Sequence, residues 1–327
     1  MISPRSVLAG LGHSVPPRIM TNLDLEKMVE TSDEWIRTRT GIRERRIAEP
    51  GTGTSKLAAE AALAALKDAK LDPKEVELII TATTTPDMPL PSTSCLVQHK
   101  IGAVKAAAFD LAAACSGFVY ALATADSFIR SGVHKNILVI GADVISPYID
   151  WTDRSTCVLF GDGAGAAVLR AGDKGGILSH SIGSDGQYAD LLKIECGGSR
   201  QPATHKSVES RGHYLKMSGA EVFKLAVRGM SDSVLDSLSK AHVKKEDIAW
   251  FIPHQANQRI IDAVGERLEL PKEKIFLNLD RYGNTSAASC AIALSEAVQS
   301  GKVKRGDKLV LATFGSGLVW GAMVLEW

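Results

Sequence analysis

Residues 112–132 read AAACSGFVYALATADSFIRSG and lead into the apolar stretch NILVIGAD at 136–143. Residues 283–301 read GNTSAASCAIALSEAVQSG and lead into KLVLATFGSG at 308–317. Both stretches consist of a turn of small residues, a helical pattern, a Ser-Gly stop and an apolar strand. An apolar strand also precedes each, LIITATTT in the first case and AWFIPHQAN in the second. The shared order predicts an internal duplication of two α/β units.

Outside these stretches the chain continues to alternate apolar strands with helical patterns, which is typical of an α/β fold with parallel or mixed sheets. We predict strands at 6–10, 78–81, 137–140, 166–169, 250–252, 308–312 and 321–325, and helices at 56–69, 117–131, 219–238, 257–268 and 287–300. We place the join of the two halves near residues 171–178. This predicts an N-terminal half, 1–172, and a C-terminal half, 173–327.

Composition narrows the class of protein. The 327 residues carry 38 Lys and Arg against 37 Asp and Glu, without the basic excess that nucleic-acid binding favours. The beginning of the chain does not have the pattern of a signal peptide, and no apolar run is long enough to span a membrane. Five widely spaced cysteines without a CxxC pair argue against disulfides and metal binding. We therefore expect a cytoplasmic enzyme with free thiols, without a metal, a nucleic-acid partner or a membrane partner.

Three residues occupy comparable places in the two halves. Cys115 stands just before the predicted helix 117–131, and Asn284 stands just before the equivalent helix 287–300. His254 follows the predicted strand 250–252. Sites in α/β proteins form beyond the carboxyl ends of strands. If the halves pack about a pseudo-twofold axis, these three residues converge on one pocket.

Cys115 has the features of a nucleophile. Small residues precede it and Gly117 opens the helix, so the thiol sits at a sharp turn. A helix N-terminus lowers a thiol pKa, and we expect a thiolate that accepts an acyl group. His254 and Asn284 are then expected to donate hydrogen bonds to a thioester oxygen that becomes negative.

Two further turns are rich in glycine. In TFGSGLVWG the backbone N–H of Ser316, together with that of Cys115, is expected to form an oxyanion hole. GDGAGA at 161–166 invites comparison with a nucleotide-binding loop, but it leads into a strand rather than a helix. We interpret it as a packing turn.

With these motifs the chain resembles a known family, the β-ketoacyl-acyl carrier protein synthases III, which are the starter condensing enzymes of bacterial type II fatty acid synthesis. The resemblance runs the whole length of the chain. It rests on SDEWIRTRTGIRERR at 32–46, AAACSGF at 112–118, FGDGAGA at 160–166, PHQAN at 253–257, YGNTSAAS at 282–289 and FGSGLVWG at 314–321.

The resemblance implies a thiolase-like, five-layered α-β-α-β-α fold made of two related halves, and a homodimer. It implies that Cys115, His254 and Asn284 are the catalytic triad. An acyl-CoA, usually acetyl-CoA, would acylate Cys115, and malonyl-acyl carrier protein would then lose carbon dioxide and condense with the acyl group. Phe314 matches the aromatic residue near the malonyl carboxylate. No cofactor is implied beyond the CoA thioester, which is a substrate.

Contacts with the two substrates also follow from the resemblance. Trp35 and Arg154 match the pair that sandwiches the adenine of CoA, and Thr31, Arg39 and Asn257 match nearby CoA contacts. Basic residues are expected to meet the acidic carrier protein. The candidates are Lys224, Arg259 and Arg267.

Two positions depart from the family pattern. Ala220 stands where many relatives have Asn at a pantetheine contact. Leu90 stands where some relatives have Phe in the loop that closes the acyl pocket across the dimer. Because Leu is smaller than Phe, the identity of the acyl group that serves as primer stays open. A longer or branched acyl group is an alternative to acetyl.

Other functions stay open on the sequence alone. A starter synthase of secondary metabolism would have the same triad and another primer. A thiolase needs a second active cysteine near the C-terminus, which TFGSGLVWG does not contain, and a hydroxymethylglutaryl-type synthase needs a positioned carboxylate. A non-catalytic carrier-protein binding module is the remaining alternative. Residues 200–212 are polar and aperiodic, and we expect a surface loop there.

Overall fold

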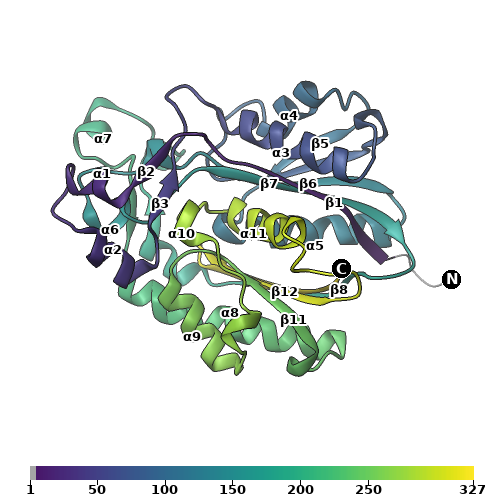
Figure 1. The fold of residues 1–327 in the computed structure, drawn as a ribbon. Coiled ribbons are helices and arrows are strands. Elements are labelled where there is room, and N and C mark those ends of the chain that lie inside the picture. Colours follow the sequence, from purple (N-terminus) through teal and green to yellow (C-terminus); the bar gives the residue numbers. More distant parts are fainter. Residues whose placement is uncertain (1–4) are drawn as a thin grey trace.

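Two β-sheets form the frame of the molecule, which is described by a computed structural model covering residues 5–327 (Figure 1). The strand order in the first sheet is β1-β7-β6-β4-β5. β4 runs parallel to β5 and β6, whereas β7 runs antiparallel to β1 and β6. The strands are β1 (Arg5–Ser14), β4 (Leu78–Ala82), β5 (Ala107–Leu111), β6 (Asn136–Asp143) and β7 (Gly163–Gly172).

The second sheet has the strand order β11-β12-β13-β8. β11 and β12 are parallel, and the other neighbours are antiparallel. Its strands are β8 (Gly176–Ser184), β11 (Ile248–Pro253), β12 (Lys308–Gly315) and β13 (Val319–Glu326). Two small antiparallel pairs complete the strands: β2 (Ile19–Thr21) with β3 (Glu44–Arg46), and β9 (Leu192–Ile194) with β10 (Leu215–Met217).

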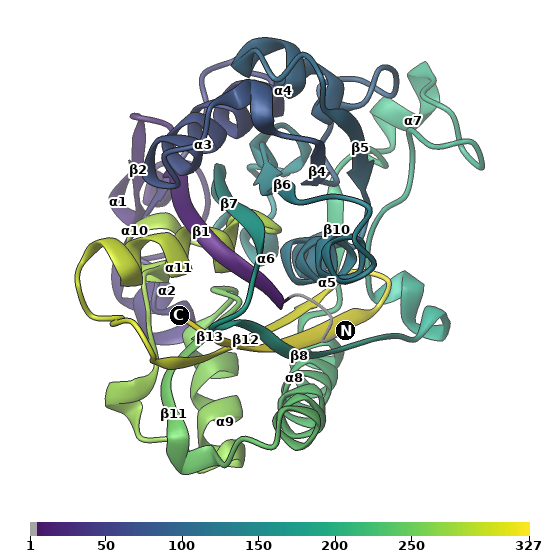
Figure 2. The same cartoon turned by 90° about the vertical axis from the view of Figure 1, so that its right-hand side faces the viewer.

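Helices lie between the sheets and on both outer faces, which gives five layers (Figures 1 and 2). α3 (Thr54–Asp68) and α4 (Thr93–Ile101) cover the first sheet, α5 (Gly117–Arg130) and α11 (Ala288–Gln299) fill the centre, and α8 (Gly219–Ala241) and α9 (Gln258–Leu268) cover the second sheet. The shorter helices are α1 (Asn22–Glu26), α2 (Asp33–Thr40), α6 (Arg154–Cys157), α7 (His205–Glu209) and α10 (Leu279–Tyr282). This is the α-β-α-β-α arrangement of the thiolase fold.

The two central helices are rich in small and apolar residues because each lies between two sheets. α11 is buried along almost its whole length. Glycine lets it approach β7 closely: a Cβ on Gly165 would lie 2.5 Å from the Cβ of Ala291, closer than two carbons can pack. The GDGAGA stretch is therefore a packing element whose glycines admit a helix, and β7 begins inside it at Gly163.

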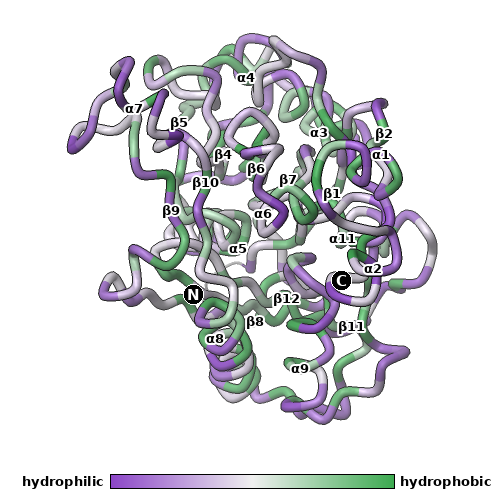
Figure 3. The backbone as a smooth tube through the Cα atoms, turned by 90° about the vertical axis from the view of Figure 1, so that its left-hand side faces the viewer, coloured by the Kyte–Doolittle hydropathy of each residue, from purple (hydrophilic) through white to green (hydrophobic). Residues whose placement is uncertain are grey.

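The predicted long helices and apolar strands are present, with ends shifted by a few residues. Several elements were missed: the strands β5 and β8 and the helices α2 and α4 lie where no element was predicted. The prediction of a loop over residues 200–212 is wrong in part, because α7 lies inside it. Apart from a few buried residues that segment is exposed, and Figure 3 shows the chain around α7 as largely hydrophilic.

The first sheet takes its strands from residues up to Gly172 and the second from Gly176 onward, although α11 packs against the first sheet as well. The division into halves at 172 and 173 stays a prediction. Within residues 5–327 no helix is both long enough and apolar enough to cross a membrane. The same part of the chain contains no group of His, Cys, Asp and Glu arranged to hold a metal ion.

Candidate active site

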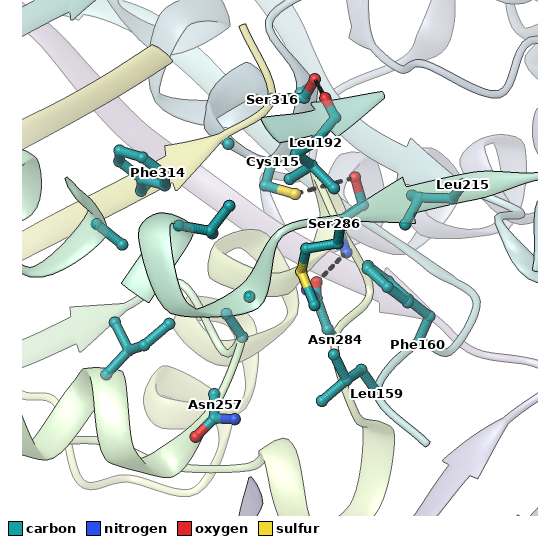
Figure 4. A pocket seen from close by; sticks show the side chains of 18 of the residues that line it. Cys115, Leu159, Phe160, Leu192, Leu215, Asn257, Asn284, Ser286, Phe314 and Ser316 are labelled. Carbon is teal, nitrogen blue, oxygen red and sulfur yellow. Dashed lines mark hydrogen bonds between the residues drawn. The ribbon is translucent and has the colours of Figure 1, made fainter. Parts of the chain in front are cut away.

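A cavity of about 1040 Å³ is lined by the N-terminal parts of α8 and α9, by the small strands β9 and β10, and by the turns that precede α5 and α11. Cys115, His254 and Asn284 all line it, so the structure brings together the two residues predicted at equivalent helix starts and the histidine predicted at a strand end. Figure 4 shows the cavity with Cys115 and Asn284 on either side of Ser286.

Cys115 lies in a short 3-10 helix, Ala114–Ser116, that leads directly into α5. The residue before it, Ala114, has φ of +43°, a left-handed conformation that a non-glycine residue adopts at some cost. The thiol Sγ donates to the hydroxyl Oγ of Ser286 at 3.6 Å. Gly315 packs against the backbone of Cys115, since a Cβ there would lie 2.7 Å from the Cys115 nitrogen.

The pKa of the Cys115 thiol is shifted in the opposite direction to the one we predicted. Burial raises the pKa of its thiol to about 12; the hydrogen bond with Ser286 lowers it, and the nearby carboxylate of Asp143 raises it further. The N-terminus of α5 favours a thiolate, but removal from water outweighs it. The thiol is therefore protonated at neutral pH.

Asn284 is held by its backbone and by one end of its side chain. Its N–H donates to the carbonyl of Leu159 at 2.8 Å, and its carbonyl accepts from Gly161 at 3.0 Å. The side-chain Oδ1 accepts from the backbone N–H of Ser286 at 2.9 Å. Because the amide oxygen is engaged in this way, the amide NH₂ is the group left to donate to a ligand.

His254 follows β11 directly and is buried. Burial lowers the pKa of its imidazole to about 4, so the ring is neutral at pH 7. Its Nδ1 forms a hydrogen bond with the hydroxyl of Ser289, at the start of α11. A neutral imidazole beside the thiol can donate one hydrogen bond without adding a positive charge.

Phe314 lies near the end of β12 and Ser316 in the turn that follows, and both line the cavity. The hydroxyl of Ser316 is directed to the carbonyl of Leu192 (Figure 4). Only the backbone of Ser316 is thus left for the oxyanion role that we predicted. Phe314 is buried and presents an apolar face to the cavity.

Four of the five residues predicted to bind CoA line the cavity. Trp35, Arg39, Arg154 and Asn257 line it, whereas Thr31 does not. The Arg154 guanidinium carbon lies 5.0 Å from the centre of the Trp35 ring. Asn257 caps α9 through its Oδ1, which accepts from the Arg259 N–H at 2.9 Å, so its NH₂ remains free.

The three basic residues predicted to contact the carrier protein lie in different surroundings. Lys224 on α8 and Arg259 on α9 line the cavity, with the Arg259 guanidinium over the ring of Phe223. Arg267 lies outside the cavity and pairs with Asp232 at 2.8 Å. Leu90 is 84% exposed and does not line the cavity of this single chain.

Sequence reasoning missed several residues of the site. Ser286 and Ser289, the partners of Cys115 and His254, lie in the quoted stretch YGNTSAAS, where their polarity among small residues was the available signal. The buried Asp143 was missed too: it accepts from Thr85 and from the Ala287 N–H, which joins the two halves behind the site. The apolar wall formed by β9 and β10 carried no signal, because those strands are short.

A half-buried thiol, two neutral hydrogen-bond donors and a largely apolar cavity fit chemistry in which an enzyme-bound acyl group meets a carbanion. On the thiolase fold this arrangement defines a condensing enzyme.

Comparison with known proteins identifies the family. The C-terminal domain of 3-oxoacyl-[acyl-carrier-protein (ACP)] synthase III matches residues 238–327, and the domain named for the same synthase matches residues 109–186. The chain is 53% identical to the beta-ketoacyl-[acyl-carrier-protein] synthase III of Caldanaerobacter subterraneus over 98% of this chain and 97% of that protein. It belongs to the β-ketoacyl-acyl carrier protein synthase III family, and it is an acyltransferase that catalyses the condensation initiating fatty acid synthesis.

Solved structures agree with this assignment. The 3-oxoacyl-[acyl-carrier-protein] synthase III of Aquifex aeolicus is 51% identical and superposes with a TM-score of 0.91, covering 98% of this chain and all of that one. The priming β-ketosynthase from the R1128 polyketide biosynthetic pathway is 37% identical with a TM-score of 0.92, covering 100% of this chain and 98% of that one.

Proposed function

We propose that this enzyme takes an acyl group from an acyl-CoA, most simply acetyl-CoA, onto Cys115 and joins it to malonyl-acyl carrier protein. The observation that carries the proposal is the gathering of Cys115, His254 and Asn284 in one cavity. The same cavity is lined by Trp35 and Arg154, and an adenine would fit between their π-faces once the guanidinium moves from its present 5.0 Å to the ~7 Å that two stacking contacts need.

In the first half-reaction the sulfur of Cys115 attacks the acyl carbonyl, and the bond to the CoA sulfur breaks. The proton of the Cys115 thiol ends on CoA, which leaves as a free thiol. The close packing of Gly315 on the Cys115 nitrogen supports a role for the backbone N–H groups of Cys115 and Ser316 as donors to the oxygen that becomes negative.

In the second half-reaction the bond between the malonyl methylene and its carboxylate breaks, and carbon dioxide leaves. The electron pair is delocalised onto the thioester oxygen, where His254 and the Asn284 NH₂ donate. The apolar face of Phe314 favours loss of the charged carboxylate as a neutral gas. The methylene carbon then attacks the acyl group, and the released Cys115 thiolate takes up a proton from solvent.

These steps require only a thiol and hydrogen-bond donors, so we propose that the reaction uses no cofactor. We also propose that the enzyme works in the cytoplasm, where five free cysteines would stay reduced.

We further propose that the enzyme is a homodimer. β5 stands at the edge of the first sheet, and edge strands with exposed apolar side chains pair readily. Phe109 on that strand is 37% exposed, and the nearby loop exposes Met88 and Leu90. Pairing of β5 with its copy would cover these residues and bring Leu90 toward the partner's cavity, as the family resemblance implies.

A second candidate concerns the primer. The likeness to a priming ketosynthase of a polyketide pathway, together with a small Leu90, favours an enzyme that accepts an acyl group longer than acetyl. The chemistry of the triad would be unchanged.

Product formation tests the proposed reaction. Purified enzyme is incubated with acetyl-CoA and malonyl-acyl carrier protein, and 3-oxoacyl-carrier protein is measured by mass spectrometry. We expect product with the wild type, none with Cys115→Ala, and a loss of about 100-fold or more in kcat with Asn284→Ala, because one oxyanion donor is removed. A fully active Cys115→Ala variant would refute the proposal.

A further inference from the structure

Ser289 forms the hydrogen bond that orients the imidazole of His254. Its Oγ lies 2.5 Å from His254 Nδ1, and both residues are buried. The same oxygen accepts from the backbone N–H of Gln255 at 3.3 Å. Ser289 belongs to the first turn of α11, whereas His254 and Gln255 follow β11, so this contact joins two of the elements that build the site.

The contacts of Ser289 decide which atom carries the proton between the two side chains. A serine hydroxyl donates once and accepts up to twice. If Nδ1 carried a proton and donated it, the Ser289 proton would need another acceptor, and the hydrogen bonds of residues 5–327 provide none. A buried O–H without an acceptor is unfavourable. If Ser289 donates to Nδ1 instead, every polar atom of the pair is satisfied.

The charge of His254 completes the argument. The ring is buried and neutral at pH 7, and no carboxylate of residues 5–327 forms a hydrogen bond with it. A neutral imidazole whose Nδ1 accepts a hydrogen bond carries its proton on Nε2. Nε2 forms no hydrogen bond with residues 5–327, and His254 lines the cavity, so this N–H is available to a ligand.

We propose that Ser289 is a positioning residue that holds His254 in the Nε2–H tautomer, ready to donate to the thioester oxygen of the malonyl group. The proposal rests on the condensation proposed above. Ser289 itself touches no substrate. It acts on the decarboxylation half-reaction, where charge grows on that oxygen, and not on acylation of Cys115.

Nitrogen-15 NMR of histidine-labelled enzyme tests the tautomer directly in the wild type. The chain has eight histidines, and the His254 signals are assigned by their loss in a His254→Gln variant. We expect a protonated Nε2 and an unprotonated Nδ1 at pH 7. A protonated Nδ1, or a doubly protonated ring, would overturn the proposal whatever the activity assays give.

Kinetics of the Ser289→Ala and Ser289→Thr variants test the consequence. For Ser289→Ala we expect kcat for malonyl decarboxylation to fall about 10- to 100-fold, as when a group that orients a catalytic imidazole is lost. KM for the malonyl thioester and the rate of Cys115 acylation should stay at the wild-type values. Ser289→Thr retains the hydroxyl and should recover most of the rate.

A matched control lies on the same helix. Ser295 is also buried and its Oγ bonds a histidine Nδ1, that of His13, at 2.9 Å, but neither residue lines the cavity. Ser295→Ala removes the same kind of bond and should leave both half-reactions unchanged.

The outcomes separate the two proposals. Wild-type decarboxylation in Ser289→Ala, or an equal loss in both half-reactions, would reject the role of Ser289. If the wild type neither acylates Cys115 nor condenses, the proposed function fails, and the NMR result alone then decides the tautomer.

Discussion

At the scale of single residues, two opposing effects act on the nucleophile. A helix N-terminus stabilises an anion by up to about 2 kcal/mol, which increases the thiolate fraction about 30-fold. Burial acts more strongly, since it raises the pKa of Cys115 to about 12. Burial therefore prevails, and the thiolate forms as the acyl-CoA reacts rather than beforehand.

This balance predicts how alkylation of Cys115 depends on pH. The rate with iodoacetamide should rise about tenfold for each pH unit from about pH 6 to about pH 9, because the thiolate fraction rises in proportion below the pKa. Peptide mapping distinguishes Cys115 from the exposed Cys95, which serves as an internal reference. A plateau below about pH 8 would mean that the helix terminus prevails over burial.

The sequence predicted the candidate triad but not its surroundings. Cys115, His254 and Asn284 stand at strand ends and helix starts, positions that a chain pattern reveals. The sign of the thiol pKa depends on burial by residues distant in sequence, and the pairing of Ser289 with His254 depends on how α11 meets β11. Such contacts arise only when the elements pack.

At the scale of elements, prediction succeeded where burial is complete. The buried helix α11 and the strand β4 gave clear apolar patterns. β5 and β8 were missed because they are edge strands whose residues are largely half-buried or exposed, so neither forms a continuous apolar run. α2 was missed because only Ile36 and Thr40 are buried and half of its residues are charged, so it shows no apolar face.

The helices α8 and α9 carry the predicted contact with the carrier protein. We expect Lys224→Glu to raise KM for malonyl-acyl carrier protein about tenfold, since like charges at a rim weaken association, and to raise KM for acetyl-CoA by less, although Lys224 also lines the cavity. Arg267→Glu should have a smaller effect, because Arg267 is already paired with Asp232.

Steady-state kinetics at low salt measures both variants. Lys100→Glu is the control, because Lys100 is exposed on α4, in the opposite outer layer. An unchanged KM in the Lys224 variant would move the docking surface away from these helices.

At the scale of the whole molecule, the exposed edge at β5 predicts an assembly. We expect sedimentation velocity to give a dimer for the wild type and a weakened dimer for Phe109→Glu, because a charge would then lie within the pairing edge. Leu63→Glu is the control: Leu63 is 46% exposed but lies on the outer helix α3. A monomeric wild type at micromolar concentration would contradict the prediction.

The central claim is that Cys115 carries the acyl group between two substrates. Intact-protein mass spectrometry after incubation with acyl-CoAs of graded length, followed by peptide mapping, tests it most directly. The account predicts a gain of one acyl group located on Cys115 and absent in Cys115→Ser, and the length accepted best identifies the primer. No mass gain with any acyl-CoA, or acylation at another residue, would contradict the account.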